Sequence, residues 1–438
     1  MWHDRLAGIF GAMGTLRGGR CCSPRCTSTA RWRRRFQVPA GSLPIPQGAD
    51  SSTGGQARRQ ASAGRIVAID ALRGFVMLLM LVDHAREFFY MHAQVSDPVN
   101  LATTPPGLFF TRLAAHLCAP VFVALTGLSA WLYGQRRGGK RAASAFLLKR
   151  GAFLVLLELT LVNFAWTFSL APSTYFLQVI WAIGWSMIAL AGLLWLPKPA
   201  LLAVGFAIVF GHNLLDPISF APGEPGSALW AIFHDRGFIE LPWDARARTS
   251  YPLAPWIGVI ALGHVIGPWF SSAVDVGTRR RRLCFLGASA LTLFMALRLL
   301  NGYGEPVPWV VGATPLKTVI SFLNLTKYPP SLDFLLLTLG VGALLLALLE
   351  RMPARGLALL TTFGAAPLFF YLAHLYLLHG LNSVALLAFG PNQGAFFSVP
   401  DIAALWGLAA VLLLPLGFAC RWFVNLKART NSAWMSYL

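Results

Sequence analysis

The fold is decided by residues 65–127, which read RIVAIDALRGFVMLLMLVDHAREFFYMHAQVSDPVNLATTPPGLFFTRLAAHLCAPVFVALTG. This stretch contains two apolar segments, and both carry charged or titratable side chains. Such side chains are costly at membrane depth, so they usually mark a functional interior. The first segment holds Asp70, Arg73, Asp83 and His84, and the second holds Arg112 and His116.

The composition is typical of a membrane protein. Of the 438 residues, 56% are hydrophobic and 12% are charged, and the mean hydropathy is +0.60. Soluble domains carry about 25% charged residues. Several apolar runs reach about 20 residues, the length that crosses a hydrocarbon core of about 30 Å. The lipid bilayer is therefore the first expected partner.

The net charge of +19 does not indicate binding to nucleic acid. Residues 1–65 hold eleven Arg and two Asp, and most of the remaining excess lies in short loops, where Lys and Arg set membrane orientation. Residues 1–64 are expected to be a disordered, basic tail, or sequence upstream of the true start codon. A transmembrane domain is expected over 65–425, followed by a short cytoplasmic tail over 426–438.

The expected fold class is an all-α, polytopic membrane bundle of about ten transmembrane helices. With ten spans, the loops rich in Lys and Arg all fall on the side of the N-terminus, so both termini are expected in the cytoplasm. Residues 306–325 are apolar but include Pro315 and Lys317, which predicts a re-entrant or interfacial helix. The spans are expected at about 66–89, 108–134, 146–170, 174–196, 198–215, 251–270, 283–300, 332–350, 358–380 and 401–424.

Helical geometry divides the polar residues of the first span between its two ends. Residues eleven apart return to nearly the same face, so Arg73 and His84 share a face about 16 Å apart along the axis. Asp70 precedes Arg73 by three residues, a spacing that suits an ion pair. Arg112 and His116 share a face of the second span, which places His116 near the depth of His84. The pattern predicts an inner charged group and an outer titratable group.

Three later segments supply polar groups at the same outer level. They are the start of span six, the segment before span eight and the end of span nine. If the bundle brings these ends together, they line an outward cavity suited to general acid–base chemistry, because His titrates near neutral pH and relays protons. The residues concerned are Tyr251, Lys327, Tyr328, Ser331 and His374.

Several of these residues also have purely structural explanations. Asp70 and Arg73 can stabilise a helix end at the interface, and His116 can bond to a neighbouring helix. Tyr251 and Tyr328 fit an aromatic belt at the membrane surface.

Two further limits apply to the histidines. His374 and His379 lie five apart, on opposite sides of one helix, so they cannot face one site. No metal is expected, because no sharp ligand spacing supports a site built from Asp83, His84, His116 and His374.

Five ordered motifs, spread over about residues 65–380, resemble the bacterial relatives of heparan-alpha-glucosaminide N-acetyltransferase. They are Asp70-Ala-Leu-Arg73-Gly74 followed by Asp83-His84; His116-Leu-Cys-Ala-Pro120-Val-Phe122-Val followed by Gly127; Tyr251-Pro-Leu-Ala-Pro-Trp256-Ile-Gly258; Lys327-Tyr-Pro-Pro-Ser331-Leu; and Pro367-Leu-Phe-Phe-Tyr371-Leu-Ala-His374.

The resemblance implies a membrane acyltransferase. The lysosomal member moves an acetyl group from cytosolic acetyl-CoA to a glucosamine amine on the lumenal side, and an active-site His is implicated. That His lies in the loop after the first helix and is followed by Ala, so His92 is one counterpart here. At Asp83-His84 and at His116 the lysosomal enzyme has other residues, so the catalytic His is expected to have moved to His84 or His116, or the reaction differs.

We therefore expect an acyltransferase of the bacterial inner membrane. Acetyl-CoA or a similar acyl-CoA would be the cytoplasmic donor, and an amine or hydroxyl of a periplasmic glycan would be the acceptor. His84 would act as general base or transient acyl acceptor, and Asp83 would orient it. His116 and His374 would assist proton transfer.

The remaining site residues are expected to bind substrate. Arg73 would attract the CoA phosphates, Arg112 an anionic acceptor, and Lys327 or Tyr328 would stabilise the developing oxyanion. Ser331 and Tyr251 would complete the cavity. The competing hypothesis is a transporter or exporter that uses the same cavity without chemistry, although the sequence shows no internal inverted repeat. The sequence is also compatible with a homo-oligomer.

Overall fold

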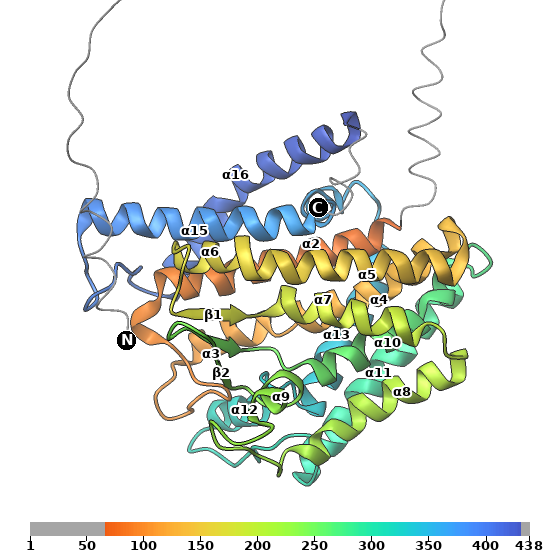
Figure 1. Cartoon of the computed structure of the whole chain (residues 1–438), viewed down its shortest axis with the longest axis horizontal. Coiled ribbons are helices and arrows are strands. Elements are labelled where there is room, and N and C mark those ends of the chain that lie inside the picture. The colour runs from red at the N-terminus through yellow and green to blue at the C-terminus, as the bar shows by residue number, and fades with distance from the viewer. Residues whose placement is uncertain (1–65, 431–438) are drawn as a thin grey trace, which may run out of the picture. The chain divides into compact units, whose positions relative to one another are not determined.

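The computed structural model describes residues 66–430, so the expected tail over 1–64 lies outside the described residues. They form a largely helical unit with three short strands, β1 (Thr174–Leu177), β2 (Phe238–Glu240) and β3 (Arg246–Thr249) (Figure 1). The helices are α2 (Val67–Phe89), α3 (Pro106–Ala115), α4 (Cys118–Arg137), α5 (Gly139–Leu157), α6 (Asn163–Thr167), α7 (Val179–Leu193), α8 (Lys198–Gly211), α9 (Ser227–Phe233), α10 (Leu253–Val265), α11 (Val276–Leu300), α12 (Pro315–Leu323), α13 (Leu332–Leu349), α14 (Ala358–Gly364), α15 (Pro367–Phe389) and α16 (Ile402–Arg429).

Six helical segments among the described residues are long and apolar enough to cross a membrane, and the chain is therefore a membrane protein. The expected ten spans are not confirmed. Helices α2 and α5 carry several charged residues and are not among the six, while α7 and α10 are apolar but shorter. The six segments are Pro106–Arg137, Lys198–Leu215, Val276–Leu300, Leu332–Leu349, Pro367–Phe389 and Ile402–Arg429.

A three-stranded sheet corrects the all-α expectation. Strand β3 lies in the middle and pairs in parallel with β1 and antiparallel with β2. Strand β1 occupies the first residues of the expected span 174–196, and helix α7 begins only at Val179. A four-residue apolar strand that runs into an apolar helix cannot be separated from that helix by periodicity.

Other boundaries also differ from the expected spans. The expected span 358–380 is divided into α14 and α15, and α15 continues to Phe389. Within the apolar segment 306–325 only α12 is helical. Helix α16 extends to Arg429, four residues into the expected tail.

A buried carboxylate joins helix α5 to helix α7. Residues Glu158–Val162 form a π-helical turn between α5 and α6, and the Glu158 side chain accepts hydrogen bonds from the backbone N–H groups of Gln178 and Trp181, both at 3.1 Å. These are N–H groups of the first turn of α7, which have no partner inside the helix. Asn163 bonds both backbone groups of Phe176 in β1, at 2.6 and 3.0 Å. The π turn thus fixes the strand and the start of α7.

Replacing Glu158 by Ala is expected to lower the free energy of unfolding by about 1–3 kcal/mol, because two buried N–H groups lose their acceptor. Thermal unfolding of purified protein in detergent measures the change. Thr160→Ala is the matched control, because Thr160 lies in the same turn but is exposed. Equal melting temperatures for Glu158→Ala and the control would contradict this assignment.

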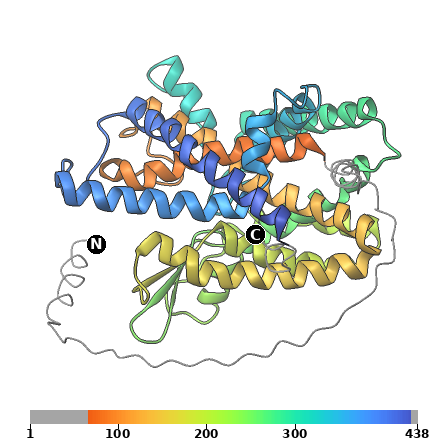
Figure 2. The same cartoon turned by 90° about the horizontal axis from the view of Figure 1, so that it is seen from above.

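Helix α2 is the packing centre of the unit, since α3, α4, α13, α14, α15 and α16 all contact it. Helix α16 crosses over α15 at an angle (Figure 2). Two glycines allow α2 and α14 to touch backbone to backbone. A Cβ on Gly74 would lie 1.9 Å from the carbonyl oxygen of Leu360, and a Cβ on Gly364 would lie 1.8 Å from that of Asp70. Gly74 of the first motif therefore has a packing role.

Candidate active site

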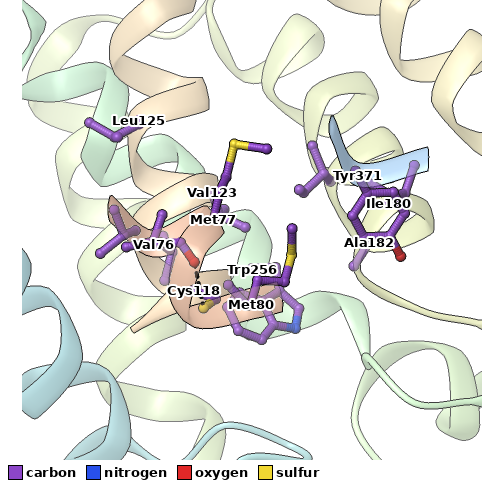
Figure 3. Close-up of a cluster of buried hydrophobic side chains, with 14 of the residues drawn as sticks. Val76, Met77, Met80, Cys118, Val123, Leu125, Ile180, Ala182, Trp256 and Tyr371 are labelled. Carbon is purple, nitrogen blue, oxygen red and sulfur yellow. Dashed lines mark hydrogen bonds between the residues drawn. The ribbon is translucent and has the colours of Figure 1, made fainter. Parts of the chain in front are cut away.

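A cavity lies between α2, α4, α5, α7 and α15, and Lys327 of the segment before α13 closes one side. Its volume is about 120 Å³. Most of the wall is apolar. Figure 3 shows part of this wall, with Met80, Cys118, Ile180 and Tyr371 labelled and the Cys118 thiol bonded to the carbonyl of Val76 at 3.1 Å. Charged and titratable groups lie at its two ends.

Two histidines form a hydrogen-bonded pair at one end of the cavity. His84 Nδ1 lies 2.7 Å from His374 Nε2, and His374 Nδ1 lies 2.7 Å from the carbonyl oxygen of Phe370. A carbonyl oxygen can only accept, so His374 Nδ1 carries the hydrogen. In a neutral imidazole the other nitrogen is then an acceptor, so His374 Nε2 accepts from His84 Nδ1. The same rule leaves His84 Nε2 with a free lone pair.

Aromatic rings hold the His84 imidazole in this orientation. Trp166 and Tyr371 meet it edge to face, with ring centroids 5.2 and 6.0 Å away. His84 is partly exposed and lines the cavity, whereas His374 is buried behind it. The pair therefore has one member that a substrate can reach and one that orients it.

The Asp83 carboxylate sits between two cations. Arg86 Nε and Nη2 donate to Asp83 Oδ1 at 3.2 Å, and Lys327 Nζ lies 3.8 Å from Asp83 Oδ2. Burial lowers the pKa of Lys327, but the neighbouring Tyr328 and Asp83 outweigh this effect and hold the pKa above its usual value. Lys327 is thus a buried, charged ammonium at the cavity wall.

Tyrosines and a second buried histidine flank this charged group. The Tyr251 and Tyr328 hydroxyls are 3.1 Å apart, and of the two only Tyr251 lines the cavity. His116 does not line it. Its ring packs on Phe334 at 5.0 Å, and neither ring nitrogen has a hydrogen-bond partner among the described residues.

The structure places three of the expected site residues away from the cavity. Arg73 is at the opposite end of α2, bonded to Asp70 at 3.1 Å and to Ser129. Arg112 pairs with Asp97 at 2.5 Å. Ser331 donates to Glu305 at 2.6 Å and caps α13.

The far end of the cavity is marked by Arg150 on α5 and Thr126 on α4. Thr126 lies eight residues along α4 from Cys118, which lines the end near His84. At 1.5 Å per residue, this separation is about 12 Å along the helix axis. The cavity is therefore elongated, with a cation at one end and the histidine pair at the other.

A comparison with protein-family models matches residues 65–298 to the family described as heparan-alpha-glucosaminide N-acetyltransferase, catalytic. This match covers more than half of the 438 residues. The chain belongs to that family. A search of curated proteins found no match.

Membership of the heparan-alpha-glucosaminide N-acetyltransferase family indicates a membrane acetyltransferase. The matched region contains Asp83, His84 and Tyr251 and ends before Lys327 and His374. The cavity thus combines residues from inside and outside the matched region. The motif resemblance over 65–380 extends further than the match.

Sequence reasoning missed two residues that line the cavity, Cys118 and Arg150, and Trp166, which packs on His84. Each is unremarkable at its position in the sequence. Glu158 carries a signal that could have found it, since an acidic residue inside an expected span is a functional or structural marker by default. Tyr371 belongs to the fifth motif, but the sequence indicates no role for it.

His92, the candidate counterpart of the lysosomal enzyme's catalytic His, does not line the cavity. It belongs to the short 3₁₀ turn Met91–Ala93, is exposed, and packs against Tyr90 with ring centroids 4.4 Å apart. Within residues 66–430, no group of three or more His, Cys, Asp or Glu side chains is arranged to hold a metal ion.

Proposed function

We propose that this protein transfers an acetyl or similar acyl group from cytoplasmic acyl-CoA to an amine or hydroxyl of a glycan on the other side of the bacterial inner membrane. The observation that carries the proposal is the chain from the Phe370 carbonyl through His374 to His84, which leaves His84 Nε2 as a base at the cavity wall. A base oriented by a second group is the usual arrangement for activating a nucleophile.

His84 Nε2 removes a proton from the acceptor amine or hydroxyl as that group attacks the thioester carbonyl. The new C–N or C–O bond forms, the C–S bond breaks, and the proton passes from His84 to the departing CoA sulfur. In the covalent variant, His84 Nε2 attacks the carbonyl first, the C–S bond breaks and CoA leaves as the thiolate. The acceptor then attacks the acyl group, its bond to Nε2 breaks, and the acceptor proton passes through the released Nε2 to the CoA thiolate. Lys327 lies within the same wall and supplies positive charge for the developing oxyanion.

The neighbouring residues have supporting roles. Asp83 holds the Lys327 ammonium at 3.8 Å, and Tyr251 closes the wall beside it. His374 acts through His84. His116 is buried next to lining residue Ala115 and assists only if the site rearranges.

The elongated cavity supports a donor and an acceptor on opposite sides. With the basic loops on the cytoplasmic side and both termini cytoplasmic, Arg150 marks the cytoplasmic end and His84 the outer end. The phosphates of CoA would remain near Arg150, while the thioester reaches inward to His84. The apolar wall between them excludes water from the thioester.

Purified protein in detergent, with radiolabelled acetyl-CoA and glucosamine, tests the reaction. We expect release of CoA together with N-acetylated product, both dependent on His84. CoA release that survives both His84→Ala and His116→Ala would contradict the histidine mechanism. Failure to bind acyl-CoA would instead favour a transporter.

A further inference from the structure

The loop between α2 and α3 carries a buried aspartate that reaches across to the segment before α13. Asp97 Oδ1 accepts from Arg112 Nη2 at 2.5 Å. Its other oxygen accepts from the backbone N–H groups of Lys327 and Tyr328, at 3.1 and 2.8 Å. The Asp97 side chain is only 3% exposed. A carboxylate so enclosed would be costly without these partners.

A second contact fixes the same two segments. The Asn324 side chain accepts from the Val99 N–H at 2.9 Å and donates to the Val99 carbonyl at 2.8 Å. Arg112 belongs to α3, so its ion pair with Asp97 also connects the loop between α2 and α3, and through it the segment before α13, to a helix. Asn324, Lys327 and Tyr328 are thus attached to the loop between α2 and α3. Glu305 and Arg298 bond Thr326 and the Asn324 carbonyl, so the loop contacts are the ones specific to the Lys327 and Tyr328 backbone.

The position of residues 324–328 determines which of their side chains lie at the cavity wall. Lys327 Nζ lies 3.8 Å from Asp83 and lines the cavity, and the Tyr328 hydroxyl bonds Tyr251, which also lines it. Neither Asp97 nor Arg112 lines the cavity itself. Their effect on the site passes through the backbone of Lys327 and Tyr328.

We propose that Asp97, paired with Arg112, is a positioning residue that holds the Lys327 ammonium beside Asp83 at the cavity wall. The inference rests on the proposed function for its catalytic consequence, but the placement of Lys327 can be measured without any reaction. It also gives Arg112 a role other than the expected contact with an anionic acceptor, because its guanidinium is engaged by Asp97.

The test compares Asp97→Asn and Arg112→Gln with wild type. An Asn oxygen can still accept from the backbone, but its NH₂ group cannot accept from Arg112, so the ion pair is lost while the shape is kept. Asp244→Asn is the matched control, because Asp244 is exposed in the loop before β3.

The first readout is the reactivity of lysines with an amine-modifying reagent, followed by mass spectrometry. Lys327 is 5% exposed, whereas Lys317 is exposed and serves as the internal reference. We expect the labelling ratio of Lys327 to Lys317 to rise severalfold in both variants and to stay unchanged in the control. A wild-type ratio in Asp97→Asn would overturn the proposal, whether or not the protein has transferase activity.

The second readout is steady-state acetyl transfer. We expect kcat to fall by about 10- to 100-fold, with KM for acetyl-CoA unchanged, because the donor enters at the end marked by Arg150. A parallel rise in KM and in labelling of all lysines would indicate general loosening and would overturn the positioning role. If wild type shows no transfer, the proposed function fails, and the labelling ratio alone decides the inference.

Discussion

Replacing His84 by Ala is expected to lower the rate of acyl transfer by about 10²–10⁴-fold, the range that a positioned general base contributes. The variant removes His84 Nε2, which lies at the cavity wall and keeps a free lone pair because His84 Nδ1 donates to His374. Affinity for acetyl-CoA should change little, because most of the cavity wall stays intact. Single-turnover transfer and equilibrium binding of CoA measure the two effects separately.

Two control variants make this prediction specific. His92→Ala should retain activity, because His92 is exposed on the turn after α2. His379→Ala should also retain it, because His379 bonds the Ala165 carbonyl at 2.7 Å and does not line the cavity. Loss of transfer in His92→Ala with normal transfer in His84→Ala would assign the catalytic His to the family counterpart and refute the proposed site.

Replacing Gly74 by Ala is expected to prevent α14 from docking on α2. The added Cβ would lie 1.9 Å from the Leu360 carbonyl oxygen, well inside van der Waals contact, and this neighbour is backbone. Overpacking in a core typically costs about 1–3 kcal/mol and more where the backbone must shift. We expect little folded monomer on size-exclusion chromatography in detergent, and a lowered melting temperature for what remains.

Gly407→Ala is the matched control for the same exchange within a helix. No atom lies within 4 Å of a Cβ placed at Gly407 of α16. Ala favours helix over Gly by about 1 kcal/mol, so this variant should melt at or above the wild-type temperature. Similar melting of Gly74→Ala and Gly407→Ala would show that α2 and α14 do not approach as closely as described.

Composition and apolar run length were sufficient to predict a helical membrane protein. They could not predict the strands, because β1 is a four-residue apolar segment that merges with α7. Nor could they separate α14 from α15, whose junction lies within one apolar run. Another difference concerns α2, which was expected to be a span. Its charged residues make it too polar to count among the six helical segments that could cross a membrane.

The candidate site was predictable where residue type and helical phase carry the information. His84, Asp83 and His374 stood out because titratable groups are rare in apolar segments. The partner of Arg112 was not predictable, because Asp97 reaches it through the fold of a loop. Similarly, Ser331 bonds Glu305 through a long-range contact that no local pattern encodes. The sequence alone therefore did not predict side-chain contacts between loops that are distant along the chain.

Sided transfer in proteoliposomes tests the central claim most directly. Vesicles containing wild type or His84→Ala would hold glucosamine inside and receive radiolabelled acetyl-CoA outside. We predict that labelled N-acetylglucosamine accumulates in the lumen of wild-type vesicles while CoA appears outside, and that His84→Ala vesicles form almost none. Equal lumenal product in both, or product only where donor and acceptor share a side, would contradict the account.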